Sequence, residues 1–178
     1  VDLDETLIHT MQDEEGVWQQ HYRPGAAEFL ALMDTCYEVV VFTAGMESYA
    51  SPIIDTLDQG GYVQHRLYRD SCLILQGRDR PLIHVKDLSL LGRDLARTII
   101  VDNSPESYML QPENAVPIKP YFADKTDDEL AGMSEFLVQV ARADVPDVRK
   151  MLARCHTKGR FRVRSSDHGP ASSVPARE

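Results

Sequence analysis

The sequence predicts an α/β fold built on a doubly wound, mostly parallel sheet with helices on both faces. Continuous apolar runs at residues 37–42 and 98–102 are typical of strands that are buried on both sides. Between such runs lie segments whose apolar residues recur as on one face of a helix. Because strands and helices alternate along the chain, a parallel sheet covered by helices is the architecture they favour.

The first half of the chain predicts two strands, each followed by a helix. Val1–Leu3 is read as a strand stub, and a helix after Arg23-Pro24-Gly25 carries an apolar face. Residues 37–42 form the next strand. A helix then spans Glu47–Leu57, with Pro52 tolerated if it lies in the first turn. The segment 11–22 is expected to overhang the cleft, with Trp18 as a core residue or loop anchor.

The second half predicts a small β-hairpin insertion, two strands and two helices. Strands at 72–75 and 82–85 flank a turn at Gly77–Arg80. Strands follow at 98–102 and 115–118. Thr126 and Glu129 have the spacing of a capping box that opens a helix, and a last helix is expected at 147–153. No segment is long enough for a large cap domain.

Composition indicates one domain at residues 1–153, followed by a tail at 154–178 that is basic and then disordered from Lys158. The net charge is −9; residues 1–148 hold 11 Lys and Arg against 26 Asp and Glu, while residues 149–164 hold seven basic residues and no acidic one. An acidic body argues against direct nucleic-acid binding. We expect a monomeric domain.

Targeting and compartment are only weakly constrained. Cys36, Cys72 and Cys155 are scattered, which favours a reducing compartment over a disulfide framework. The chain lacks an initiator Met and starts inside a predicted strand, so we expect a piece of a longer protein whose missing amino-terminal region leaves membrane association open. We expect an intracellular location, in the nucleus or the nuclear envelope and ER rather than the mitochondrion.

Polar residues follow three of the predicted strands. Asp2 and Asp4 end the first, Thr43 follows the second and Asp102 ends another. Active sites of parallel α/β sheets lie beyond the carboxyl ends of the strands. We therefore expect these residues to converge on one crevice.

Two carboxylates with one residue between them can divide a phosphoryl transfer. Asp2 is the candidate nucleophile, which would form an aspartyl-phosphate. Asp4 is the candidate general acid and base, and Thr6 would support the turn or orient Asp4. The alternative is an acidic turn without chemistry.

A magnesium site and a phosphate site are predicted beside this pair. Asp2, Asn103 and the backbone carbonyl of Asp4 offer oxygen ligands of the kind that Mg²⁺ prefers, with Asp102 in support; the alternative is a plain turn at residues 102–105. Phosphate oxygens would be bound by Thr43, Lys86 and Arg69. Their alternatives are a helix cap, a solvated lysine and a surface ion pair with Asp70.

The motifs stand in a recognisable order: DLDETLIHT, RPGAAEFL, YEVVVFTAG, YRDSC, HVKDLSLLGRD, IIVDNSP and PENAVPIKPYF. Over residues 1–153 the chain resembles the FCP/SCP-type branch of the haloacid-dehalogenase superfamily. That resemblance implies a haloacid-dehalogenase-like fold and Mg²⁺-dependent dephosphorylation of serine in proteins. It matches Asp2 to the nucleophile, Asp4 to the general acid and base, Thr43, Lys86 and Arg69 to phosphate binding, and Asp102 and Asn103 to the metal-proximal pair.

The leading hypothesis is a Mg²⁺-dependent serine/threonine phosphatase acting on a phosphorylated protein. Residues 9–23 are shorter than the insertion that forms a substrate pocket in polymerase-tail members of the branch, which argues against that specificity. The first alternative is a catalytically silent binding module of the same fold, such as a mitochondrial import translocase subunit. The second is a small-molecule phosphatase, against which the short segment after Thr6 argues.

Overall fold

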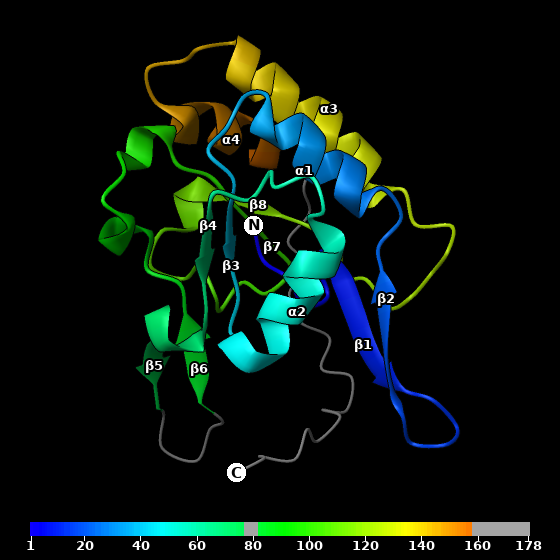
Figure 1. The fold of residues 1–178 in the computed structure, drawn as a ribbon. Coiled ribbons are helices and arrows are strands. Elements are labelled where there is room, and N and C mark those ends of the chain that lie inside the picture. The colour runs from blue at the N-terminus through cyan, green and yellow to red at the C-terminus, as the bar shows by residue number, and fades with distance from the viewer. Residues whose placement is uncertain (77–81, 158–178) are drawn as a thin grey trace.

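A computed structural model describes residues 1–76 and 82–157 and confirms an α/β fold with parallel strand pairs (Figure 1). The predicted turn at Gly77–Arg80 and the predicted tail from Lys158 lie outside the described residues. The strands are β1 (Ile8–Gln12), β2 (Trp18–Tyr22), β3 (Val40–Phe42), β4 (His65–Leu67), β5 (Leu73–Leu75), β6 (Ile83–Val85), β7 (Ile100–Asp102) and β8 (Ala115–Pro117). The helices are α1 (Ala26–Asp34), α2 (Glu47–Leu57), α3 (Glu129–Arg142) and α4 (Val148–Thr157). Short 3₁₀ turns occupy Arg69–Ser71, Leu88–Leu91, Leu95–Arg97 and Pro112–Asn114.

The first two residues join two parallel strand pairs. β3 pairs with β4, and β7 pairs with β8. On one side, the Val1 amine donates to the carbonyl of Val40 at 2.7 Å, and the Phe42 amide donates to the carbonyl of Val1 at 2.9 Å. On the other side, the Asp2 amide donates to the carbonyl of Val101 at 2.9 Å. The structure assigns no strand to the predicted stub Val1–Leu3, yet its backbone bonds on both sides as a central strand would.

β3 is shorter than the apolar run that predicted it. The run starts at Tyr37, whereas pairing starts at Val40. The Tyr37 hydroxyl donates to the carbonyl of Leu137 on α3, and Glu38 binds Arg93 through both carboxylate oxygens. These tertiary contacts hold both residues outside the ladder. β7 likewise begins at Ile100 rather than at residue 98.

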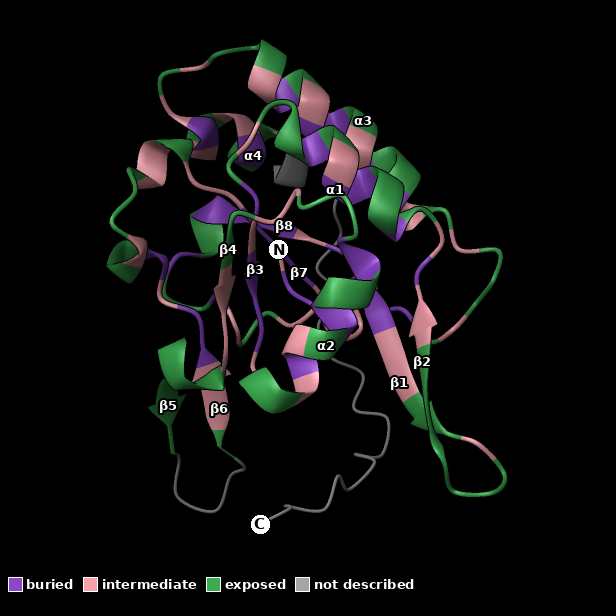
Figure 2. Cartoon of the chain, in the orientation of Figure 1, coloured by how far each residue is buried: buried purple, intermediate pink, exposed green. Residues whose placement is uncertain are grey.

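Strands β1, β3, β7 and β8 and all four helices contribute buried residues to the main apolar core, whereas β5 is exposed along its length (Figure 2). α1 packs on α3. The apolar stripes predicted for α1, α2 and α3 are buried, with the exception of Ala141 at the end of α3, which is only half-buried. Fully buried members include Leu3, Leu7, Ile8, Leu30, Ala50, Ile54, Val116 and Leu152. Burying each large apolar side chain stabilises the fold by about 1.5–3 kcal/mol.

Two helix details differ from the sequence prediction. α3 starts at Glu129, and Thr126 caps nothing: its hydroxyl donates to Asp124, so the predicted capping box is absent. Asp127 instead accepts from the Glu129 amide and from the buried Arg23. Pro52 is the sixth residue of α2 and not in its first turn, and it is exposed. On the solvent side of a helix, water can satisfy the carbonyl that a proline leaves without a donor.

Two antiparallel strand pairs flank the parallel strands (Figure 1). One of them is formed by β5 and β6. The pair β1 and β2 was not predicted as a hairpin, because its strands are largely polar. Trp18, at the start of β2, is 42% exposed, so it is not a core residue.

The last described helix extends beyond its predicted end. α4 runs to Thr157, four residues past the predicted end at Ala153. Its apolar residues Val148 and Leu152 are buried in the core. Within residues 1–76 and 82–157, no helix has the length and apolar character needed to cross a bilayer.

Arg23 connects the amino-terminal loop to α3. Its side chain is fully buried and donates to both oxygens of Asp127 at 2.6 and 2.8 Å, to the carbonyl of Thr6 and to the carbonyl of Lys119. Removing one partner of a buried ion pair leaves an uncompensated charge. We expect Arg23→Ala to lower the free energy of unfolding by about 3–5 kcal/mol, measured by urea denaturation.

Arg93→Ala is the matched control for that experiment. Arg93 also binds a carboxylate through two nitrogens, but the pair with Glu38 is exposed to solvent and therefore stabilises little. Equal losses of stability in the two variants would show that burial of Arg23 does not govern the effect.

Candidate active site

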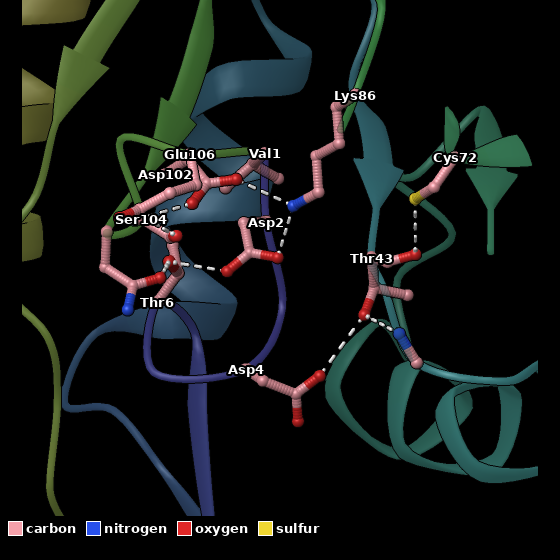
Figure 3. Close-up of polar contacts among 12 residues, drawn as sticks. Val1, Asp2, Asp4, Thr6, Thr43, Cys72, Lys86, Asp102, Ser104 and Glu106 are labelled. Atoms are coloured by element: carbon pink, nitrogen blue, oxygen red, sulfur yellow. Dashed lines mark hydrogen bonds and ion pairs between the residues drawn. The ribbon is translucent and has the colours of Figure 1, made fainter. Parts of the chain in front are cut away.

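Three strand ends bring Asp2, Lys86 and Asp102 together (Figure 3). The Lys86 ammonium lies 2.6 Å from Oδ1 of Asp2 and 2.7 Å from Oδ2 of Asp102. Lys86 is 1% exposed, which excludes the alternative of a solvated surface lysine. The predicted convergence of Asp2 and Asp102 is confirmed, and Lys86, which was predicted separately as a phosphate binder, lies between them.

The buried charges of this cluster do not balance. Burial alone lowers the pKa of Lys86, but the Asp2 and Asp102 carboxylates outweigh burial and raise it above its usual value, so the ammonium stays charged. Burial, followed by the negative charge of Asp2, raises the pKa of Asp102 to about 6 against the opposing effect of Lys86. One cation therefore faces two carboxylates in a nearly dry setting, and a further cation would stabilise them.

The chain turns sharply after Asp2. The amides of Thr6, Leu7 and Ile8 all point at the carbonyl of Leu3, at 3.3, 2.9 and 3.1 Å. Glu5 has a φ of 59°, a left-handed conformation that is strained for a residue with a side chain and is typical of functional sites. This turn explains how residues i and i+2 of one strand end can face different partners.

Thr6 lies inside the turn and orients the candidate nucleophile. Its hydroxyl is fully buried, 3.0 Å from Oδ2 of Asp2 and 3.3 Å from Oδ1 of Asn103. The sequence left two roles open for Thr6, support of the turn or orientation of Asp4. In the structure its hydroxyl contacts Asp2, not Asp4.

Asp4 has neutral partners. Tyr49 donates to Oδ1 at 2.6 Å, and Thr43 donates to Oδ2 at 3.2 Å. Burial, opposed by the Tyr49 hydrogen bond and reinforced by the charge of Asp2, raises the pKa of the Asp4 carboxyl. A carboxyl whose pKa is raised holds its proton more readily, as a general acid requires.

Two of the three oxygen atoms predicted to bind Mg²⁺, those of Asp2 and Asn103, lie around one hydroxyl. Oδ1 of Asp2 is taken by Lys86, so Oδ2 faces the Thr6 hydroxyl together with the side chain of Asn103. Among the described residues, no three His, Cys, Asp or Glu side chains are grouped as a metal site. The predicted magnesium ligands are of mixed type: one side-chain carboxylate (Asp2), one side-chain amide (Asn103) and one backbone carbonyl (Asp4). Oxygen donors beside excess negative charge fit a hard divalent cation.

Asp102 holds Lys86 rather than offering a free oxygen. Its Oδ2 binds the ammonium, and its Oδ1 accepts the amide of Ser104 at 2.8 Å. The residue is 1% exposed. Both oxygens of Asp102 are thus engaged within the protein, and the metal-ligand role of Asn103 stays a prediction.

Thr43 lies on the loop that follows β3, and Arg69 begins the 3₁₀ turn that follows β4. The Thr43 hydroxyl accepts the amide of Gly45 at 2.9 Å, which is the geometry of a strand-to-helix turn, and also reaches Asp4. Arg69 is exposed, and its Nε donates to the carbonyl of Ala44 at 2.7 Å. It therefore lies beside the site, although none of its bonds reaches a site carboxylate. The phosphate-binding roles of Thr43, Lys86 and Arg69 stay predictions.

The sequence did not single out Tyr49 or Thr10. Tyr49 lies in the first turn of α2 and donates to Asp4, and Thr10 on β1 lies 2.8 Å from the Tyr49 hydroxyl. The sequence signal for Tyr49 was weak: it lies in the first turn of the helix that follows a predicted strand. No sequence signal pointed to Thr10, because it is one of several polar residues in a largely polar strand.

A cavity of about 320 Å³ lies away from this cluster. Its walls include Val39 and Val40 on one side and Ile99 and Ile100 on the other, at the amino ends of β3 and β7. Asp4, Thr43 and Lys86 do not line it. The candidate active site lies instead at the opposite, carboxyl ends of the strands.

Fold and site together define a haloacid-dehalogenase-type domain of the FCP/SCP branch. Within it, the chain belongs to the family described as NLI interacting factor-like phosphatase, which matches residues 1–149. The human CTD small phosphatase-like protein is 43% identical over 169 residues, which cover 86% of this chain and 59% of that protein. Human carboxy-terminal domain RNA polymerase II polypeptide A small phosphatase 1 is 42% identical, at 81% and 59% coverage. The chain thus spans about three fifths of these relatives.

Solved structures support the same fold. The structure of Fcp1, described as an essential RNA polymerase II CTD phosphatase, aligns with a TM-score of 0.71 and 16% identity. The alignment covers 88% of this chain and 69% of that one. Likeness at this level of identity supports the fold alone.

We expect Mg²⁺ to raise the free energy of unfolding through the oxygen atoms around Asp2. At a concentration one hundred times its dissociation constant, the rise is about 2.7 kcal/mol. Asn103→Ala should lose most of this increase, whereas Asn103→Asp should keep it, since an oxygen ligand is retained. Thermal unfolding with and without Mg²⁺ measures the difference. A full Mg²⁺ effect in Asn103→Ala would remove Asn103 from the ligand set.

Proposed function

We propose that this chain is the catalytic domain of a Mg²⁺-dependent serine/threonine phosphatase that acts on proteins through an aspartyl-phosphate. The observation that carries the proposal is the fixed orientation of Asp2. One of its oxygens is 2.6 Å from the Lys86 ammonium and the other is 3.0 Å from the Thr6 hydroxyl. A nucleophile held in one orientation avoids much of the entropic cost of the attack.

In the first step an oxygen of Asp2 attacks phosphorus and forms a new P–O bond. The bond from phosphorus to the serine or threonine oxygen breaks, and Asp4 gives its proton to that oxygen. Lys86 and the Thr43 hydroxyl lie where they can stabilise charge on the phosphoryl oxygens. Bound Mg²⁺ would add positive charge beside Asp2 and neutralise the approaching phosphate.

In the second step water hydrolyses the aspartyl-phosphate. Asp4, now ionised, takes a proton from the water as it attacks phosphorus. Inorganic phosphate leaves, and both carboxylates return to their starting states. Each proton lost by Asp4 in the first step is thus recovered in the second.

A protein substrate is supported by the small size of the segment beside the site. The chain between Thr6 and Arg23 forms only the β1–β2 hairpin, which is much smaller than a cap domain. Two exposed apolar side chains could contact a peptide. Met46 directly precedes α2, and Phe122 contacts the ring of His9. The names of the relatives, which are phosphatases of an RNA polymerase II domain, point to phosphorylated protein as well.

The proposal includes two details of the fold, the doubly wound sheet and the short hairpin insertion. The hydrogen bonds of Val1 and Asp2 to both neighbouring strands support a doubly wound sheet, and the β5–β6 pair supports a short hairpin insertion. Activity, substrate and partners of the whole protein belong to the proposal, because the chain spans only part of its relatives. The monomeric state and the compartment stay predictions.

A binding module of the same fold is the rival. Such a module would keep the ion pair between Asp2 and Lys86 but would not hydrolyse a phosphorylated substrate. The two functions separate in an assay of phosphate release from a phosphoserine peptide, with Mg²⁺ and with a chelator.

We expect Asp2→Asn to lower kcat by about 10⁴-fold or more, because the covalent route is lost when the nucleophile is removed. Wild-type protein that is quenched in acid should carry phosphate as an acyl phosphate, which hydroxylamine releases. Mass spectrometry measures this adduct, and the assay above measures turnover.

Asp13→Asn is the matched control, a carboxylate-to-amide change in the β1–β2 loop. Asp13 accepts backbone amides of Glu15 and Val17, contacts that an asparagine oxygen can replace. Its activity should equal that of the wild type. Turnover that survives in Asp2→Asn would refute the aspartyl-phosphate route, and absence of Mg²⁺-dependent turnover in the wild type would favour the binding module.

A further inference from the structure

Asp4 is held by a chain of hydroxyl groups that comes from two other elements. Its Oδ1 accepts the Tyr49 hydroxyl at 2.6 Å, a length typical of a strong hydrogen bond to a carboxylate. The Tyr49 oxygen lies 2.8 Å from Oγ1 of Thr10. A phenol has one hydrogen, so when it donates to Asp4 it must accept the hydrogen of Thr10. The hydrogen bonds then run from Thr10 through Tyr49 to Asp4.

The ring of Tyr49 is fixed in place by close packing. Tyr49 lies in the first turn of α2, and its side chain is half-buried against the core. A Cβ atom at Gly45 would stand 3.0 Å from Cδ1 of Tyr49 and 3.1 Å from Oγ1 of Thr43. Glycine at position 45 therefore lets the loop after β3 lie directly against the ring, which keeps the hydroxyl aimed at Asp4.

The two oxygens of Asp4 are consequently not equivalent. Oδ1 receives a hydrogen from Tyr49 along a chain that starts on β1, so it is the oxygen least able to carry a proton of its own. Oδ2 has only the longer contact, 3.2 Å to the Thr43 hydroxyl, which can accept a hydrogen from Oδ2 as well as donate one to it. This oxygen lies beside the loop that is proposed to bind the phosphate. A proton on Oδ2 lies on the side of the site where the leaving oxygen would be.

We propose that Tyr49, anchored by Thr10, is a positioning residue that confines the transferable proton of Asp4 to Oδ2 and so favours substrates with poorly leaving alkoxide groups. This inference rests on the proposed function. When the P–O bond to a serine oxygen breaks, the proton moves from Oδ2 of Asp4 to that oxygen. Tyr49 and Thr10 keep their own protons throughout.

The leaving group provides the test. A serine alkoxide is strongly basic and needs a proton as it departs, whereas nitrophenolate departs without one. We therefore expect Tyr49→Phe to slow formation of the phosphoenzyme from a phosphoserine peptide by about 10- to 100-fold, a part of the contribution of a general acid. With p-nitrophenyl phosphate the rate should fall by less than about threefold. Rapid acid quench under single-turnover conditions with Mg²⁺ measures both rates.

Three further variants show whether the effect passes through Asp4. Thr10→Val should give the same dependence on the leaving group, with a smaller loss. Adding Tyr49→Phe to Asp4→Asn should cause no further loss, because coupled residues are not additive. Tyr37→Phe is the matched control, since it removes a hydroxyl that donates to the carbonyl of Leu137 outside the site; both rates should be unchanged.

The outcomes separate this inference from the proposed function. Equal losses with both substrates, or an additive loss in the Asp4→Asn background, would show that Tyr49 has a merely structural role. If the rate of phosphoenzyme formation falls with neither substrate, Tyr49 has no role in positioning Asp4. If wild-type protein forms no phosphoenzyme from either substrate, the proposed function fails and the inference fails with it.

Discussion

The ion cluster of Lys86 with Asp2 and Asp102 is the constraint on which the rest of the site depends. An ammonium that is 1% exposed is tolerable only between carboxylates, and each carboxylate comes from a different strand end. Breaking such a cluster leaves a buried charge, which costs about 3–5 kcal/mol. The three strand ends are therefore held in one arrangement, and the loops that carry the other site residues are built outward from it.

The amino-terminal turn is the second fixed part, and Arg23 connects it to the fold. Three amides gather at the carbonyl of Leu3, and Glu5 adopts a left-handed conformation that costs of the order of 1–3 kcal/mol. Such strain persists only where the surroundings compensate it. Arg23 does so by binding the carbonyl of Thr6 while its other nitrogens bind α3 through Asp127. Packing far from the carboxylates thus sets their geometry.

The sequence predicted what depends on local pattern and missed what depends on tertiary contact. Continuous apolar runs located β3 and β7, and the rule that sites lie at strand ends then brought Asp2, Thr43 and Asp102 together. The capping box at Thr126 failed because Asp127, one residue on, is recruited by Arg23 from a hundred residues away. The hairpin β1–β2 was missed because its strands are polar, and with it Thr10. Tyr49 required the meeting of α2 with Asp4, which no local spacing encodes.

The same reasoning explains how two carboxylates two residues apart can take different duties. Asp2 is held between a fixed ammonium and a hydroxyl, which fix its orientation for attack. Asp4 faces only the hydroxyls of Tyr49 and Thr43, and burial raises its pKa. Environments that differ in this way assign acid and nucleophile in an acid–base pair. The division of labour lies in the partners that the turn at Glu5 brings to each carboxylate, since the two side chains are chemically identical.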